Sequence, residues 1–290
     1  MSTTTAQAFV AFLENITATD YQKETLIPAR KKSAIETLES TFPTTSDLPF
    51  WSAHLMGSAA KNTITRPIDD VDVLAVFSNE KDAWNKYWND SKSFIYRIRA
   101  AYDGTHIQQV GARGQAVRIF FQTGGHVDVA PVFFKGDGVY HLPAGDGSWV
   151  LTAPLKATEW YQGQSKTLSY NLSPLVRMLK KWNASHSKRM RSFHLETMAA
   201  SMFSTLGTNR QDAVLKFFQW ASGYMDVSDP GGQSGSLSSY LTWNGRSDVL
   251  NSFTAAEKRA SDAIAAEARG NHAEAKRLWA ILFGTEFPTG

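Results

Sequence analysis

The acidic and apolar residues that alternate at Asp70-Val71-Asp72-Val73 are the part of the sequence that most directly indicates chemistry. Successive side chains of a β-strand point to opposite faces, so Asp70 and Asp72 would share one face, about 6.5–7 Å apart. The apolar run that continues to Phe77 indicates a buried strand rather than a solvated hairpin. Two neighbouring carboxylates repel each other without a cation, and their oxygens suit hard divalent ions such as Mg²⁺.

A Gly57-Ser58 pair precedes this strand, separated from it by the eleven residues 59–69. Backbone N–H groups and a hydroxyl at such a turn bind phosphate oxygens, while the two carboxylates bind the accompanying metal. Neither motif is specific alone, but together they predict a site for a nucleoside triphosphate. Asp69 would point away from both carboxylates, and we expect it to belong to the turn.

A third carboxylate, Asp128, stands in the apolar segment 126–134. An acidic side chain in a buried strand is costly unless it is paired or bound to a metal. We therefore expect Asp128 to join Asp70 and Asp72 as a metal ligand. An ion pair with an arginine such as Arg118 is the alternative explanation.

Between Glu159 and Glu196 the chain carries no acidic residue. The basic residues of this stretch are Lys166, Arg177, Lys180, Lys181, Lys188, Arg189 and Arg191. A run of like charge is often only a solvated face. Here it would face the carboxylates, and we expect it to neutralise a triphosphate. His194 has no partner at metal-ligand spacing, so we expect an ordinary histidine.

Apolar periodicity predicts a mixed N-terminal region followed by a helical region from about residue 158. Helices are expected at 5–16, at 20–38 with a kink or break at Pro28, and at 80–102, and strands within 50–77, 117–121 and 126–134. In the helical region, Ser173 is expected to cap a helix, and Gly270 to separate the last two helices.

The composition is that of an ordinary globular protein, and 290 residues suit two packed lobes. The absence of cysteine excludes disulfides, thiolate zinc sites and a cysteine nucleophile, and fits a reducing cytoplasm. Neither a signal peptide nor a long apolar run is visible, so we expect a cytoplasmic protein outside the membrane. A net charge of +3 is too small to predict binding of long nucleic acid.

These motifs resemble those of the CD-NTases, the bacterial relatives of cyclic GMP–AMP synthase and oligoadenylate synthase in CBASS anti-phage defence. The resemblance covers nearly the full length of the chain. It is carried by Gly57-Ser58, Asp70-Val71-Asp72, 127–131, 175–183, 192–196, Asp229-Pro230 and the ending from Trp279 to Pro288.

The resemblance implies an α+β fold in two parts. A polymerase-β-like nucleotidyltransferase lobe, made of a mixed sheet with flanking helices, would pack against a C-terminal helical lobe. The active site would lie in the cleft between them. The catalytic lobe with its N-terminal helices would span residues 1–157 and the helical lobe residues 158–290.

The resemblance also implies roles for individual residues. The catalytic, metal-binding residues would be Asp70, Asp72 and Asp128, and the nucleotide-binding residues would be Gly57, Ser58, Lys180, Ser192 and Phe193. Lys181 is a second possibility for the lysine that contacts the triphosphate. Two Mg²⁺ ions, with Mn²⁺ as a substitute, would be the cofactors, and ribonucleoside triphosphates the substrates.

The implied reaction is two-metal nucleotidyl transfer with release of pyrophosphate, repeated until a cyclic di- or oligonucleotide messenger closes. Asp128 would help to bind the first ion and would accept the hydroxyl proton. Some relatives are regulated by a partner encoded in the same operon or are conjugated through a C-terminal glycine. Gly290 is therefore a candidate conjugation site.

Two alternatives remain open on the sequence. The chain could be a nucleotidyltransferase that acts on an RNA end or a protein, although its weak net charge disfavours long RNA. It could also be a catalytically silent nucleotide- or RNA-binding regulator, although all three carboxylates are present.

Overall fold

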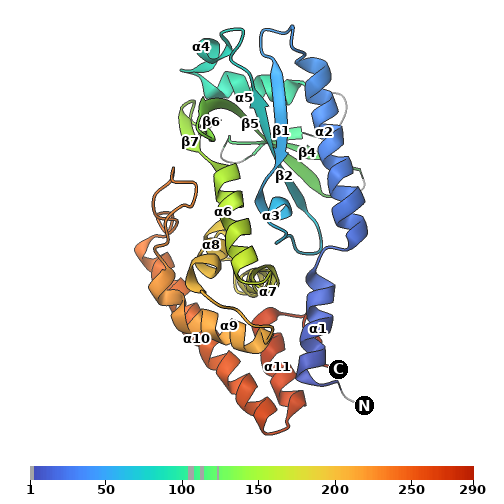
Figure 1. The fold of residues 1–290 in the computed structure, drawn as a ribbon, viewed down its shortest axis with the longest axis vertical. Coiled ribbons are helices and arrows are strands. Elements are labelled where there is room, and N and C mark those ends of the chain that lie inside the picture. The colour runs from blue at the N-terminus through green and yellow to red at the C-terminus, as the bar shows by residue number, and fades with distance from the viewer. Residues whose placement is uncertain (1–2, 104–107, 112–113, 123) are drawn as a thin grey trace.

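A half built on a β-sheet and a half built on helices meet end to end in the computed structural model of the protein (Figure 1). The structure describes residues 3–103, 108–111, 114–122 and 124–290. The chain passes from the sheet half to the helical half through α6 (Pro154–Thr167).

Along the chain, helical segments come first, a region of mixed helices and strands follows, and the remaining described elements are all helical. The helices are α1 (Thr5–Ile16), the π-helical segment η1 (Gln22–Leu26), α2 (Ile27–Thr41), α3 (Gly57–Ala60), α4 (Ala83–Tyr87), α5 (Ser91–Ala100), α6, α7 (Leu172–Ser185), α8 (Ser192–Met202), α9 (Arg210–Trp220), the 3₁₀ turn η2 (Ala221–Tyr224), α10 (Trp243–Ala268) and α11 (His272–Phe283). The strands are β1 (Phe50–Leu55), β2 (Asp70–Phe77), β3 (Gln108–Val110), β4 (Val117–Phe120), β5 (His126–Gly136), β6 (Val139–Pro143) and β7 (Trp149–Thr152).

The strands form one mixed sheet with the order β1-β2-β5-β4-β3. In addition, β6 pairs with β5, and β7 pairs with β6. Strands β2 and β5 are parallel, whereas the other described pairs are antiparallel. Strand β5 pairs with β2 over most of its length, with β4 near its start and with β6 near its end. It therefore holds the centre of the sheet in place.

The two faces of β2 have different neighbours, as the alternation of its side chains requires. Val71, Val73 and Phe77 belong to the core that packs under α2 and α5. Leu74 and Val76 point to the opposite face and cluster there with Leu155 of α6 and with Val132. Asp70 and Asp72 alternate with the core residues and point to the same face as Leu74. They therefore lie at the start of the face that α6 covers.

The core of the helical half includes α1, although α1 is the first element of the chain. Phe9 lies edge-on to Trp279 of α11 with 5.0 Å between ring centroids, and Phe12 lies 4.9 Å from Phe283. Both phenylalanines belong to the same buried cluster as the residues of α7 to α11. The expected division at residues 157 and 158 stays a prediction, but α1 packs with the helices that follow it.

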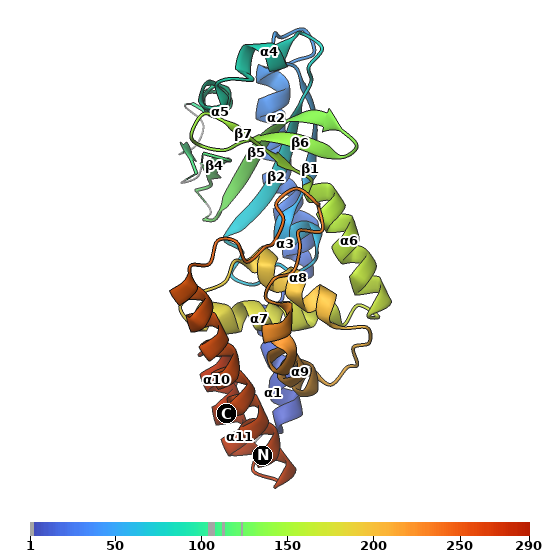
Figure 2. The ribbon, with the colours of Figure 1, turned by 90° about the vertical axis from the view of Figure 1, so that its left-hand side faces the viewer.

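A loop between η2 and α10 reaches from the helical half to the start of α6 (Figure 2). A Cβ atom on Gly231 would lie 2.9 Å from the carbonyl oxygen of Ala153. The backbone of the loop therefore packs closely against the backbone just before α6. Among the described residues, no helix combines the length and apolar character needed to cross a membrane.

Several predicted elements are confirmed. The helix at 5–16 has the expected bounds, and Gly270 separates α10 from α11 with φ = +77°. Strands β2, β4 and β5 form in the segments that were predicted to be strands from the pattern of apolar and polar residues. His194 is an ordinary buried histidine, as expected. Its two ring nitrogens form hydrogen bonds with the Met225 carbonyl oxygen and the Tyr240 hydroxyl.

Two local predictions were wrong. The helix expected at 80–102 is two helices, because the Asp90 carboxylate accepts the Ser93 N–H and starts α5 afresh. Ser173 does not cap α7, because α7 already begins at Leu172. The irregularity expected at Pro28 is present, because the π-helical segment η1 gives way to α2 directly before Pro28 within one continuous helical stretch.

Replacement of Phe12 by alanine is expected to destabilise the protein by about 3–5 kcal/mol, because Phe12 is fully buried in the core of the helical half. Val10, on the same helix, is 59% exposed, and Val10→Ala should change stability by less than about 0.5 kcal/mol. Urea unfolding of the three proteins measures both values. Equal stability of the two variants would show that α1 does not belong to this core.

Candidate active site

The pairing of β2 with β5 brings the predicted carboxylates together. Asp72 stands opposite Asp128 in the parallel ladder, and Asp70 stands opposite His126. Asp70 is exposed, whereas Asp72, two residues further along β2, is partly buried. This register, which no single segment of the sequence could specify, places Asp72 beside Asp128, and the joint metal site of the three carboxylates stays a prediction.

Asp72 lies in an environment that opposes its negative charge. Burial, followed by the nearby charges of Asp70 and Asp128, raises the pKa of Asp72 to about 7, while Lys180 and Lys61 act in the opposite direction. The raised pKa means that burial and the two neighbouring carboxylates outweigh the two lysines and disfavour the charged form of Asp72. A bound cation would add positive charge there.

Gly57 touches Asp72 so closely that no other residue fits. Its φ is +62°, and a Cβ atom there would lie 2.0 Å from Oδ2 of Asp72. The Met56 N–H also donates to the Asp72 carbonyl oxygen at 3.0 Å. The predicted phosphate loop and the predicted metal site are therefore in direct contact, with Ser58 next to Gly57 in the short turn α3.

Asp128 already has a partner, because both of its carboxylate oxygens accept hydrogen bonds from Arg118, at 2.8 and 2.7 Å. The ion pair that was the alternative explanation for Asp128 is thus present. Within the described residues, no three His, Cys, Asp or Glu side chains are grouped closely enough to hold a metal ion.

The residues nonetheless fit a hard divalent cation in donor type and in charge. All three candidates offer carboxylate oxygens, and the repulsion of Asp72 by Asp70 and Asp128, which adds to the effect of burial on its pKa, would be relieved by a cation. Asp128 would have to exchange its contacts with Arg118 for the metal.

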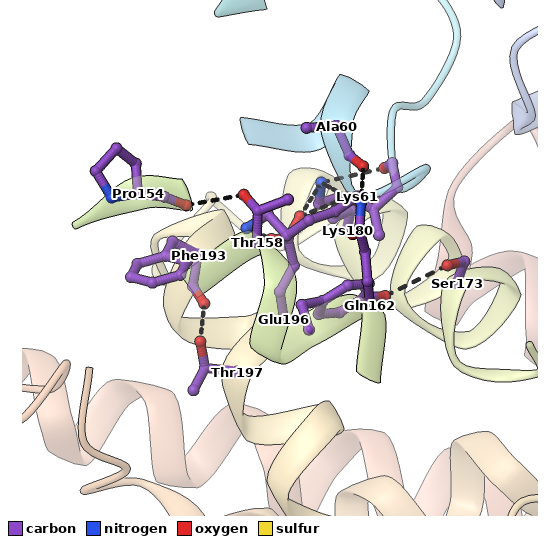
Figure 3. A network of polar contacts seen from close by, with 12 residues as sticks. Ala60, Lys61, Pro154, Thr158, Gln162, Ser173, Lys180, Phe193, Glu196 and Thr197 are labelled. Carbon is purple, nitrogen blue, oxygen red and sulfur yellow. Dashed lines mark hydrogen bonds and ion pairs between the residues drawn. The ribbon is translucent and has the colours of Figure 1, made fainter. Parts of the chain in front are cut away.

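The helical half contributes a buried ion-pair network (Figure 3). The carboxylate of Glu196, on α8, pairs with Lys61 through one oxygen and with Lys180 through the other, each at 2.5 Å. The Thr63 hydroxyl donates to Glu196 at 2.7 Å and lies 3.1 Å from the Lys180 ammonium. The network joins the segment after α3 to α7 and α8.

The two ammonium groups determine the ionisation of Glu196. Its burial alone would raise the pKa, but Lys180 and Lys61 lower it to about 2. One carboxylate between two lysines has a net charge of +1. Both Lys61 and Lys180 lower the pKa of Asp72. The network therefore faces the carboxylates with net positive charge.

The remaining predicted residues lie around this network. Lys180 joins it, whereas Lys181 turns away and pairs with Glu286 at 2.7 Å, so the structure favours Lys180 as the lysine near the carboxylates. Ser192 is the exposed first residue of α8. Phe193, next in sequence, has the Lys61 ammonium over its ring, 4.7 Å from the centroid.

The sequence reasoning assigned no role to Lys61, Thr63 or Glu196. Glu196 had a usable signal, since it is the residue that ends the stretch without acidic residues and it stands in an otherwise apolar helix segment. Lys61 had none, because a single lysine after a turn is commonly a solvated side chain.

Replacement of Glu196 by glutamine is expected to cost about 3–5 kcal/mol, because it leaves the buried Lys61 and the largely buried Lys180 without a counter-charge. Glu274→Gln removes an exposed pair with Arg277 and should cost less than about 1 kcal/mol. Urea unfolding at neutral pH measures the difference. Equal stability of the two variants would mean that the network is not formed in solution.

The same pair of variants should differ in pH dependence. Because the folded-state pKa of Glu196 is lowered from 4.5 to about 2, its contribution is fully present above pH 4.5 and is lost as the pH falls toward 2. Glu196→Gln should lack this part of the acid destabilisation, whereas Glu274→Gln should keep it.

The sequence of the chain matches a family model. The model, which describes the Second Messenger Oligonucleotide or Dinucleotide Synthetase domain, covers residues 1–165, more than half of the chain. The chain is 25% identical over 272 residues to a probable cyclic nucleotide synthase of Bacillus cereus (strain VD146), covering 80% of this chain and 81% of that protein. It is 27% identical over 189 residues to the cyclic AMP-AMP-AMP synthase of Escherichia coli (strain MS 115-1), covering 60% and 59%.

Solved structures share the fold over nearly the whole chain. The E. coli MS115-1 CdnC structure solved with HORMA-deltaN aligns with a TM-score of 0.76 at 18% identity, covering 97% of this chain and 98% of that one. The Vibrio cholerae DncV cyclic AMP-GMP synthase, solved with a linear intermediate, aligns with a TM-score of 0.71 at 14% identity, covering 99% and 97%. The polymerase-β-like α+β fold predicted from the sequence is thereby confirmed. The chain belongs to the second messenger oligonucleotide or dinucleotide synthetase family, and it is a CD-NTase, a nucleotidyltransferase of the cyclic nucleotide synthase type.

Proposed function

We propose that this enzyme joins ribonucleoside triphosphates into a cyclic di- or oligonucleotide messenger for anti-phage signalling and releases pyrophosphate at each transfer. The observation that carries the proposal is the contact between the two predicted motifs. Gly57 packs against Asp72, and Asp72 stands opposite Asp128 in the ladder. A triphosphate on the glycine turn would lie beside the carboxylates.

Asp70, Asp72 and Asp128 are the residues that would hold Mg²⁺ or Mn²⁺. Two such ions would lower the pKa of the attacking ribose hydroxyl and stabilise the charge of the departing pyrophosphate. Asp128, once released by Arg118, would lie where it can accept the hydroxyl proton. Arg118 would then be free to pair with a phosphate oxygen, for which its planar guanidinium is suited.

Lys180 and Lys61 are positioned to neutralise the triphosphate. Glu196 holds both ammonium groups in fixed positions, so little side-chain entropy is lost when a phosphate binds. Ser58 and Ser192 would add hydroxyl donors from the two sides of the site. One side of the Phe193 ring lies under Lys61, and a base would stack on the other side.

Other proteins of this fold bind nucleotides and partners. The E. coli MS115-1 CdnC has been solved with ATP and with HORMA-deltaN, and the Bradyrhizobium diazoefficiens CdnG with GTP. We propose that the present enzyme also takes ATP or GTP and is controlled by a regulatory partner. Conjugation through Gly290 would require its carbonyl oxygen to give up hydrogen bonds from Thr3 at 2.6 Å and Lys276 at 3.1 Å.

Replacement of Asp72 by asparagine is expected to lower pyrophosphate release by at least about 10²–10³-fold, because the site loses a charge aimed at the reacting groups. The assay uses free ribonucleoside triphosphates and Mg²⁺ without RNA, with the regulatory partner added if the wild type requires it. Asp69→Asn is the matched control, since this neighbouring side chain is 82% exposed and lies outside the proposed metal site.

Near wild-type activity of a folded Asp72→Asn protein would contradict the proposed role of the carboxylates. Pyrophosphate release that requires added RNA would instead favour a nucleotidyltransferase that acts on RNA ends.

Replacement of Lys180 by glutamine is expected to reduce kcat/KM for the nucleotide by about 10–100-fold, the value of one lost charge-assisted contact. Lys188→Gln removes an exposed lysine from the same basic stretch and should leave kcat/KM unchanged. Steady-state kinetics with circular dichroism as a folding check provide the comparison. A Lys180 variant that is folded and fully active would show that other residues bind the triphosphate.

A further inference from the structure

A cavity is lined by Lys61 but by none of the three predicted carboxylates. It has a volume of about 280 Å³ and is formed by α3 and the residues after it together with α6 and α7. Gln162 of α6 donates to the Ala60 carbonyl oxygen at 3.0 Å and ties its rim to α3 (Figure 3). The cavity therefore spans the junction of the two halves of the molecule.

Arg177 is the buried cation of this cavity. It is 6% exposed and forms no ion pair with any described residue. Its Nη2 donates to the carbonyl oxygen and the side-chain oxygen of Asn62, at 2.7 and 3.1 Å. Its Nε is buried without a hydrogen-bond partner, and burial lowers the pKa of the guanidinium. A buried, unpaired charge of this kind is costly unless something binds it.

The rest of the lining suits an anion. Ser165, Ser173 and Tyr161 contribute buried hydroxyl groups, and the Tyr161 and Ser173 hydroxyls share one hydrogen bond of 3.5 Å, in which only one of the two donates. None of the described residues that line the cavity is acidic. Its volume is slightly below that of pockets for drug-sized ligands, so it fits a small metabolite rather than a second nucleotide.

The cavity and the catalytic centre share one side chain. Lys61 lines the cavity, and its ammonium group pairs with Glu196, which in turn holds Lys180. An anion in the cavity would attract Lys61 and compete with Glu196 for it. Glu196 would then pair more completely with Lys180, which would become less available to a triphosphate.

We propose that this cavity is a binding site for a small metabolite with an oxyanion group, phosphate or carboxylate, held by Arg177 and the hydroxyls around it. Its occupancy restrains the catalytic lysine through Lys61 and Glu196. This regulatory effect rests on the proposed function, whereas binding to the cavity does not.

Isothermal titration calorimetry with inorganic phosphate and, in a second arm, malonate tests binding in the absence of nucleotide and metal. Saturable binding is expected to the wild type and to Lys180→Gln, and binding at least tenfold weaker to Arg177→Gln. A stronger response to phosphate identifies a phosphate ligand, and a stronger response to malonate a carboxylate ligand. Ser165→Ala, a mild change in the lining, should weaken binding less than Arg177→Gln.

Two results would overturn the proposal. One is the absence of saturable binding to the wild type in both arms. The other is binding that is lost in Lys180→Gln and kept in Arg177→Gln, which would place the oxyanion at the triphosphate site.

If Arg177→Gln does not fold, wild-type crystals soaked in selenate replace this comparison. An anomalous peak beside Arg177 supports the site, and a crystal with peaks only elsewhere contradicts it. Neither measurement requires turnover, so failure of the proposed function and failure of this inference are distinguishable.

Discussion

The ion-pair network around Glu196 is the interaction on which the catalytic arrangement depends. One buried carboxylate fixes the ammonium groups of Lys61 and Lys180, and these come from opposite sides of the junction between the sheet half and the helical half. The contact settles the position of the basic helix α7 relative to the sheet. Because a buried charge without its partner is costly, the network also couples the stability of the protein to the geometry of the site.

The carboxylates and the lysines are complementary parts of one electrostatic arrangement. The sheet concentrates negative charge, since parallel pairing places Asp72 beside Asp128 and Gly57 leaves no side chain between the turn and the carboxylate. Burial and this concentration of charge together raise the pKa of Asp72. In the proposed function, a nucleoside triphosphate with its divalent cations would compensate both charges, because the cations would bind the carboxylates and the phosphates would bind the lysines.

Much of this arrangement follows from local sequence pattern. Period-2 alternation was enough to place Asp70 and Asp72 on one face of a strand, because Val71 and Val73 must enter the core. The pairing of Asp128 with Asp72 depends on strand register across a long connection, which local pattern does not contain. Glu196 ends a long stretch without acidic residues, but its lysine partners are known only from the structure, because Lys61 lies 135 residues away in the sequence. The family resemblance supplied the rest of the fold.

The identity of the product tests the central claim most directly. The purified protein would be incubated with the four ribonucleoside triphosphates labelled at the α-phosphate, with Mg²⁺ or Mn²⁺ and with a regulatory partner where needed, then treated with phosphatase and analysed by mass. The account predicts labelled phosphate that survives in a small cyclic nucleotide, because ring closure leaves no terminal phosphate to remove. Label found only in RNA, in protein or in free phosphate under these conditions would contradict it.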